Sequence, residues 1–151
     1  MQNEKIKQNP WLFFANNDLA LAELAIDDLQ FTGQVAFLCQ QAIEKYLKAF
    51  LFENKIQIRK IHDLEKLYSE VRKIKDFGIN ENLLQILRNL YVESRYPTDV
   101  AFLESGVLPT KEDAQSYLDF AKKVANIIKT ELEEKNYPLN KNNIISPSCT
   151  S

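Results

Sequence analysis

An arginine, a tyrosine and a proline stand together at residues 95–97, within the stretch YVESRYPTD (residues 91–99). Proline disfavours the α conformation in the residue before it and cannot continue a hydrogen-bonded helix, so a helix that reaches this point should close at about Arg95. A guanidinium is a planar fork of donors that suits phosphate, and an aromatic ring beside it can stack on a base or a sugar. The group formed by Arg95, Tyr96 and Pro97 is therefore suited to holding a nucleotide or an RNA phosphate.

Arg95 also has a purely structural interpretation. A cation at a helix C-terminus complements the helix dipole, typically by about 0.3 to 1 kcal/mol, and Asp99 could pair with it. On a helical wheel Arg95 falls at the border of the apolar face, two turns beyond Arg88. This interpretation suffices for the arginine but does not explain Tyr96 and Pro97, so both alternatives stay open.

Four polar side chains form a second candidate group on one side of an otherwise apolar helix: Gln41, Glu44, Lys45 and Lys48. One interpretation is a solvent-facing stripe in which a Glu44–Lys48 pair contributes about 0.2 to 0.5 kcal/mol. The alternative is a stripe that faces a cleft. Phe37, Leu51 and Phe52 would make a poor solvent face, which argues for the second alternative, and both stay open.

His62 is the chain's one histidine and lies in KIHDLEKL (residues 60–67). As a structural residue its ring, or the carboxylate of Asp63, would accept from free amides in the first turn of a helix. As a functional residue it would be a titratable group at the mouth of a cleft.

Several classes of site are excluded by residue counts. The three glycines are far apart and each falls between helical patterns, so neither a P-loop nor a dinucleotide-binding glycine motif can be written. A single histidine excludes the paired Glu-x-x-His metal sites of helical bundles, and zinc would need clustered cysteine and histidine. We expect no metal and no cofactor.

Helices must position these side chains. Apolar residues recur along the chain at steps of three and four, and no segment shows the alternation of a strand. The expected helices begin at Pro10, run from Gln34 to about Glu53, begin near His62 or Asp63, run from about Asn80 to Arg95, and begin at Thr110. In the last of these, Thr110 and Asp113 resemble a capping box. The prediction from these patterns is an all-α bundle of about five helices over residues 10–135. A polar extension (residues 1–9) precedes it and a flexible tail (136–151) follows.

Charge and cysteine content set the expected surroundings. The net charge is −2, but residues 45–75 carry nine Lys or Arg against four Asp or Glu, so a nucleic-acid or nucleotide surface would lie there unless the run is merely a solvated face. Two distant cysteines, a polar start and the lack of an apolar run of about 18 residues favour a cytoplasmic protein with no membrane span.

Three motifs, taken in order, closely resemble the HEPN domain, the higher-eukaryote and prokaryote nucleotide-binding family. They are CQQAIEKYLKAFL (residues 39–51), KIHDLEKL (60–67) and ESRYP (93–97), and the resemblance extends over about residues 10–134. It implies an up-and-down helical bundle that is commonly a homodimer. It also implies a gene often encoded beside a minimal nucleotidyltransferase, the two forming a toxin–antitoxin pair.

Many HEPN domains are ribonucleases with an arginine followed four to six residues later by a histidine. Here Arg95 is followed by YPTDVAF and no histidine stands downstream, while His62 follows Arg59 too closely. The chain instead resembles the branch with Arg-Tyr-Pro at this place, for which nucleotide binding has been proposed. The resemblance assigns phosphate contacts to Arg95, Lys45 and Lys48, stacking to Tyr96 and a polar contact to His62, with Asp99 beside Arg95.

The resulting hypothesis is a non-catalytic HEPN-like domain that binds a nucleotide or an RNA phosphate in a cleft lined by the second, third and fourth helices, as a homodimer. One alternative is a protein-interaction or dimerisation module without a ligand. Another is a ribonuclease with an altered site, in which Tyr96, Asp99 or His62 acts with Arg95.

Overall fold

The computed structural model describes residues 4, 8–58, 60–95 and 109–136. Its elements are α2 (Pro10–Ala25), a 3-10 turn η1 (Leu29–Phe31), α3 (Thr32–Glu53), α4 (Leu64–Arg72), α5 (Glu81–Arg95) and α7 (Lys111–Asn136). The described residues contain no strand, so the prediction of an all-α bundle with five helices of this order is confirmed. Tyr96, Pro97 and Asp99, and the predicted tail beyond residue 136, lie outside the described residues.

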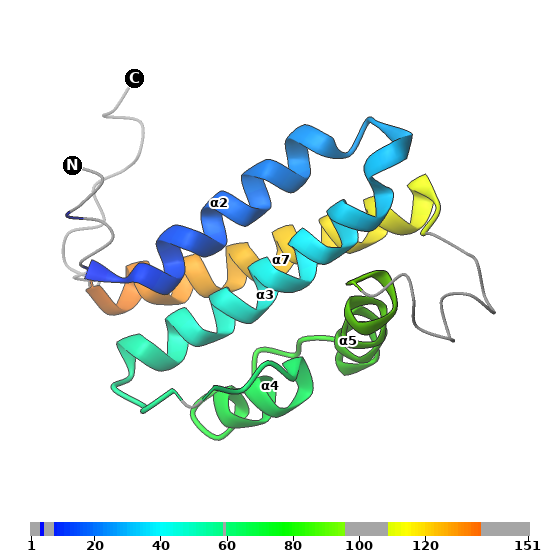
Figure 1. The fold of residues 1–151 in the computed structure, drawn as a ribbon. Helices are drawn as coiled ribbons and strands as arrows, with labels where there is room; N and C mark the ends of the chain where they lie inside the picture. Colours follow the sequence, from blue (N-terminus) through cyan, green and yellow to red (C-terminus); the bar gives the residue numbers. More distant parts are fainter. Residues whose placement is uncertain (1–3, 5–7, 59, 96–108, 137–151) are drawn as a thin grey trace.

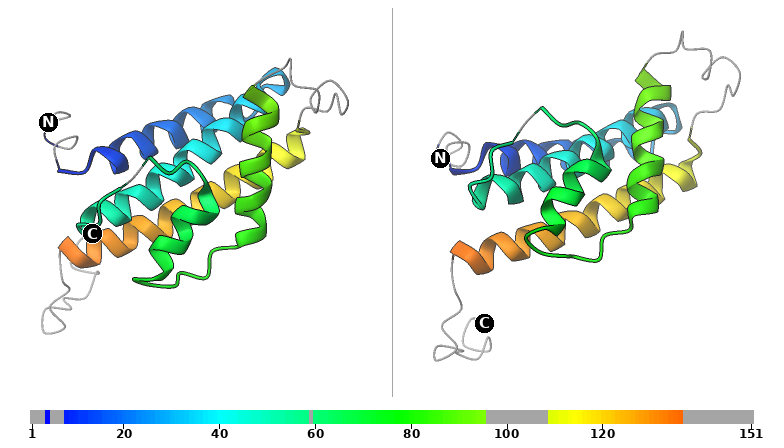
Figure 2. Two further views of the ribbon diagram at one scale, coloured as in Figure 1. Left: turned by 60° about the horizontal axis from the view of Figure 1, so that its bottom comes forward. Right: turned by 90° about the horizontal axis from the view of Figure 1, so that it is seen from below.

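Three long helices form the body of the bundle, with α2 and α7 packed against α3 (Figure 1). The shorter helices α4 and α5 contact α3 on its remaining side, and α5 crosses the long helices steeply (Figure 2). Among the described helices, α3 and α7 are the longest, with 22 and 26 residues. The central position of α3 follows from its sequence, which is apolar nearly all round.

Side-chain caps define the helix starts where the sequence indicates them. Pro10 occupies the first turn of α2, and the Asn9 side chain accepts from the Leu12 amide at 3.1 Å. In α7 the predicted capping box is formed: Thr110 Oγ1 accepts from the Asp113 amide at 3.1 Å, and the Asp113 carboxylate accepts from the Thr110 amide at 3.2 Å. These bonds satisfy amides that a helix start leaves without partners.

The break before α3 differs from the prediction. Gly33 lies in the first turn of α3, which begins at Thr32, and is not part of the break. The chain turns earlier, at η1, where the Asp28 carboxylate accepts from the Gln30 amide at 3.1 Å. By contrast, Gly78 does lie in the turn between α4 and α5, and its φ of +67° is one that side chains rarely allow.

The core lies mainly on the side of α3 that faces α2 and α7. Its largest fully buried side chains are Tyr46, Tyr68, Phe50, Ile43 and Leu47, joined by leucines of α4 and α5. Tyr46 reaches across to α2, where its hydroxyl donates to Asn16 Oδ1 at 2.6 Å. No helix within the described ranges is long and apolar enough to cross a membrane.

Candidate functional site

Another side of α3 carries polar side chains that are nonetheless buried. Gln40, Glu44 and Lys48 are only 2%, 4% and 3% exposed. The solvent-facing interpretation of the stripe is therefore wrong for Glu44 and Lys48, because α2 and the segment before α4 cover positions that a helical wheel alone leaves open. We call Gln40, Glu44, Lys48 and His62 the α3 polar cluster.

Glu44 is the centre of this cluster. Its Oε2 lies 3.4 Å from Lys48 Nζ and its Oε1 lies 3.3 Å from His62 Nδ1. Both distances are long for charge-assisted hydrogen bonds, which typically measure about 2.7 to 2.9 Å. The carboxylate therefore keeps the capacity to accept stronger bonds.

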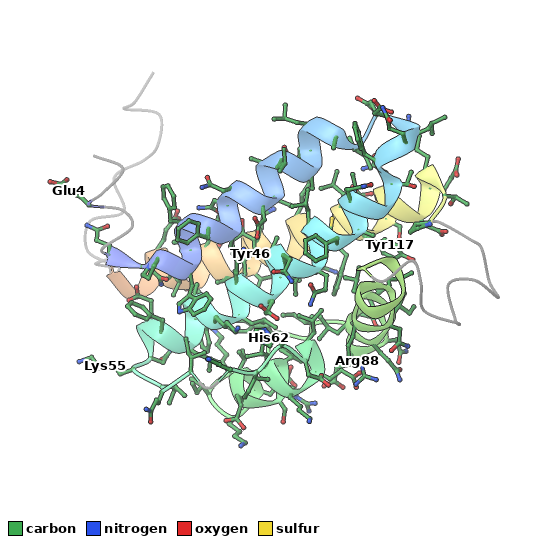
Figure 3. The ribbon with its side chains drawn as sticks, viewed as in Figure 1. Glu4, Tyr46, Lys55, His62, Arg88 and Tyr117 are labelled. Atoms are coloured by element: carbon green, nitrogen blue, oxygen red, sulfur yellow. The ribbon has the colours of Figure 1, made fainter. Side chains whose placement is uncertain are left out.

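The Lys48 ammonium is enclosed by protein groups. Besides Glu44, it lies 4.8 Å from the centroid of the Trp11 ring of α2, within the range of a cation–π interaction. His62 is different, because its side chain is 69% exposed. His62 is thus the member of the cluster that solvent or a ligand can meet directly (Figure 3).

Lys45 does not join the cluster. Its ammonium pairs with the Asp18 carboxylate of α2, on the side of α3 next to α2. Both lysines that the sequence offered as phosphate contacts are consequently paired with carboxylates inside the chain. A ligand phosphate would have to share Lys45 with Asp18 or Lys48 with Glu44.

Asp63 ties the segment around His62 to two helices. Its carboxylate caps α4 by accepting from the amides of Glu65 and Lys66 at 3.0 and 3.2 Å, and it also accepts from Arg88 of α5 at 3.0 Å. Burial raises the pKa of Asp63, but the bonds from the Lys66 amide and from Arg88 outweigh it and leave that pKa below its usual value. The cap proposed for this place is therefore made by Asp63, and the His62 ring is directed to Glu44.

Arg95 is the last described residue of α5, and its side chain lies outside the described part. The helix places its backbone two turns beyond Arg88, about 10 Å further along the axis and on the same face. Since Arg88 contacts Asp63 next to His62, this face of α5 is the one turned toward the His62 segment. Whether Arg95 shares a pocket with Lys45 or Lys48 stays a prediction.

The basic run at residues 45–75 is largely neutralised by internal pairing. Five of its cations have carboxylate partners: Lys45, Lys48, Arg72, Lys73 and Lys75. Within the described part of the run, Lys55, Lys60 and Lys66 lack such a partner, and Arg59 lies outside it. Fewer cations of this run are therefore available to bind an external anion than its composition suggests.

Two pockets lie elsewhere. One, of about 430 Å³, is lined by the end of α3, the segment at residues 56–61 and α4; the other, of about 280 Å³, lies between the start of α5 and α7. Neither is lined by a predicted site residue. No metal-binding group of His, Cys, Asp and Glu is found among the described residues.

Three residues that line or support this region were not predicted from the sequence. Gln40 lies one turn before Glu44 and accepts from Gln41 Nε2 at 2.7 Å, so its spacing to Glu44 was a usable signal. For Trp11 and Arg88 no sequence spacing indicated a contact, because Trp11 contacts Lys48 of α3 and Arg88 pairs with Asp63, the cap of α4.

Comparison with known proteins places the fold. A family profile for the HEPN domain matches residues 9–133. The solved structure of TT1696 from Thermus thermophilus is 22% identical, with a TM-score of 0.60 over 80% of this chain and 94% of that one. The structure of ST0689, an archaeal HEPN homologue, is 25% identical, with a TM-score of 0.58 over 81% and 94%. No curated protein matches the chain. Because the profile covers most of its residues, the chain belongs to the HEPN domain family.

Proposed function

We propose that this HEPN domain binds a nucleotide or an RNA phosphate, without catalysis, where α3 and the His62 segment meet the end of α5. The site comprises His62, Arg95, Tyr96 and Asp99, with Lys45 and Lys48 on α3. The buried Glu44–Lys48 pair is the observation that carries the proposal. Replacing buried ion pairs by apolar residues of similar volume is often neutral or stabilising, so stability alone is a weak reason for this pair on the central helix.

The balance of charge among the described residues supports a decisive part for Arg95 in the proposed binding. Lys45 is balanced by Asp18, Lys48 by Glu44, and Arg88 by Asp63 together with Glu65. A phosphate that approaches this region meets no net positive charge from those groups. The guanidinium of Arg95 would supply the missing charge, with Tyr96 stacking on a base or sugar.

Calorimetric titration with ATP, GTP and a short single-stranded RNA tests the proposal. We expect Arg95→Gln to weaken binding at least tenfold, since hydrogen bonds to charged groups contribute about 1.5 to 3 kcal/mol. Arg72→Gln is the matched control, because Arg72 is an exposed cation paired with Glu81 on the far part of the α4–α5 turn. A wild-type chain that binds none of these ligands, or an Arg95→Gln chain that binds as well as wild type, contradicts the proposal.

A second candidate, an interaction module, is favoured by the outer surface of α2 and η1. Four large apolar side chains are exposed there: Phe14 at 46%, Leu21 at 53%, Leu24 at 82% and Leu29 at 69%. Such a surface suits a homodimer or a minimal nucleotidyltransferase partner in a toxin–antitoxin pair. Sedimentation equilibrium and co-purification with a neighbouring nucleotidyltransferase, each repeated with Leu24→Lys, would test it; a monomeric wild type that retains no partner contradicts it.

One contact supports the third candidate function, a ribonuclease with an altered active site. The carboxylate of Glu44 lies beside His62 Nδ1 and can orient the exposed ring as a general base. An RNA cleavage assay with His62→Gln and Arg95→Ala decides the matter, since equal background cleavage in all three chains rules the enzyme out.

A further inference from the structure

A pocket of about 430 Å³ lies where the end of α3, the segment at residues 56–61 and α4 meet, and we call it the α3–α4 pocket. Its volume is within the range of ligand-binding pockets, about 300 to 1,000 Å³. Ile56, which lines it, is 42% exposed, so part of this lining is in contact with water. Most of the lining is aliphatic: Leu51, Ile56, Ile58, Ile61 and Leu67.

Three exposed lysines lie next to this pocket. Lys55, Lys60 and Lys66 each directly precede one of the aliphatic lining residues, and none of the three has a carboxylate partner among the described residues. Glu70, the acid of the lining, is paired with Lys73 at 2.8 Å. The surroundings of the pocket therefore carry a net positive charge that internal pairs leave available.

Lys55 occupies a backbone position that favours glycine. The end of α3 forms a Schellman motif, in which the amides of Lys55 and Ile56 donate to the carbonyls of Phe52 and Leu51, both at 3.0 Å. Lys55 has a φ of +57°, in the left-handed region that a side chain disfavours. Stability alone would favour glycine here, so it does not explain the ammonium group that extends from the end of α3 (Figure 3).

The lining suits a peptide better than a nucleic acid. Bases of single-stranded RNA stack on aromatic rings, and no aromatic side chain is among the described residues that line this pocket. The Glu70 carboxylate repels phosphate, whereas Glu70 and Gln57 both offer oxygens that accept from main-chain N–H groups. An apolar side chain of a peptide can fill the pocket, and acidic residues beside it complement the lysines.

We propose that the α3–α4 pocket binds an acidic segment of a partner protein. One large apolar side chain of that segment enters the pocket, and its Asp or Glu residues pair with Lys55, Lys60 and Lys66. No residue of this pocket belongs to the proposed nucleotide site. The exposed residues of η1 are also distant, because η1 directly precedes α3 and the pocket lies at the other end of that helix, roughly 30 Å away at 1.5 Å per residue.

Selection from a display library of random short peptides on the full chain tests this proposal. We expect the enriched peptides to carry one Leu, Ile, Met or Phe flanked by Asp and Glu. Fluorescence anisotropy then measures the dissociation constant of the most enriched peptide. Exchange of its apolar residue for Ser should weaken binding about tenfold or more, because buried apolar anchors carry much of the binding energy. Exchange of its acids for Asn and Gln, or added salt, should also weaken binding.

Lys55→Gly removes one of the lysines and also relieves the left-handed backbone. It should weaken binding of the enriched peptide about threefold, within the range of exposed ion pairs, while the urea midpoint of the chain does not fall. Combined with Lys60→Gln and Lys66→Gln, it should weaken binding about tenfold. Lys122→Gln is the matched control, because Lys122 lies on α7 and pairs with Glu23, and it should leave binding unchanged.

Ile56→Asp places a carboxylate in the lining and should weaken the same peptide about tenfold or more. The lysine variants decide the matter if this variant does not fold. Failure to enrich peptides of the expected pattern overturns the proposal, as does equal binding of the enriched peptide by wild type and the triple lysine variant. A short oligouridylate that binds through these lysines, when no such peptide is enriched, assigns the surface to nucleic acid instead.

Discussion

Two sides of α3 are both buried, but only one of them carries buried polar side chains. The side toward α2 and α7 carries Val35, Cys39, Ala42, Tyr46 and Ala49, all fully buried, while the other carries Gln40, Glu44 and Lys48. Burial of the first set is favourable by about 25 cal/mol per Å² of apolar surface. Burial of the second set brings a desolvation cost that the internal pairs only partly offset. Burial of the apolar side explains the stability of the fold. Burial of the polar side is not explained by stability, so we infer that it serves a function.

Truncation on the apolar side should produce the largest loss of stability. Tyr46→Ala removes a fully buried ring and its bond to Asn16, so we expect the free energy of unfolding to fall by about 3 to 5 kcal/mol. Urea denaturation followed by circular dichroism measures it. Tyr46→Phe, which removes only the hydroxyl, should cost about 1 kcal/mol. A loss below about 1 kcal/mol for Tyr46→Ala would mean that this side of α3 is not the main core.

On the polar side, single and double substitutions should behave differently. Glu44→Met leaves the Lys48 charge buried without its carboxylate and should cost about 3 kcal/mol, whereas Glu44→Met combined with Lys48→Met should restore stability to within about 1 kcal/mol of wild type or exceed it. The same urea titrations measure both. If the double variant is as unstable as the single one, the pair is a structural element of the core and the contrast between the two sides fails.

Removal of the Asp63 carboxylate should have a smaller effect. Asp63→Ala deletes the cap of α4 and the bond to Arg88, and we expect a loss of about 1 kcal/mol. Asp113→Ala, at the cap of α7, is a matched control for a cap remote from the polar cluster. An equal loss in both variants, with unchanged ligand binding in Asp63→Ala, would indicate that Asp63 acts only as a cap.

The lowered pKa of Asp63 also predicts how folding stability changes with pH. Its pKa is lower in the folded chain than in the unfolded one, so its contribution is present above about pH 4, the ordinary Asp value, and is lost as pH falls through the folded pKa. Wild type should therefore lose more stability than Asp63→Asn as the pH falls below about 4, the ordinary Asp value. Identical pH profiles would show that the lowered pKa is not coupled to folding.

More of the fold than of the candidate site could be predicted from the sequence. Caps such as Thr110 and Asp113, and the apolar periods of five helices, are local patterns, and local patterns determine where these helices begin. The site depends on contacts between helices: Lys45 pairs with Asp18, 27 residues away, and Lys48 packs on Trp11. A helical wheel gives directions on one helix but not what its neighbours cover, which is why Glu44 and Lys48 were open to a solvent-facing interpretation. Gly33 was misplaced because the turn at Asp28 breaks the chain first.

The most direct measurement is a dissociation constant for wild type and for the Glu44→Met/Lys48→Met double variant, taken under conditions in which both are fully folded. The ligand is whichever of ATP, GTP and a short single-stranded RNA wild type binds most tightly. If the polar side of α3 serves a ligand, the double variant should bind that ligand at least tenfold more weakly while its stability is equal or higher. Equal binding by the two chains would contradict this and would return Glu44 and Lys48 to a structural role.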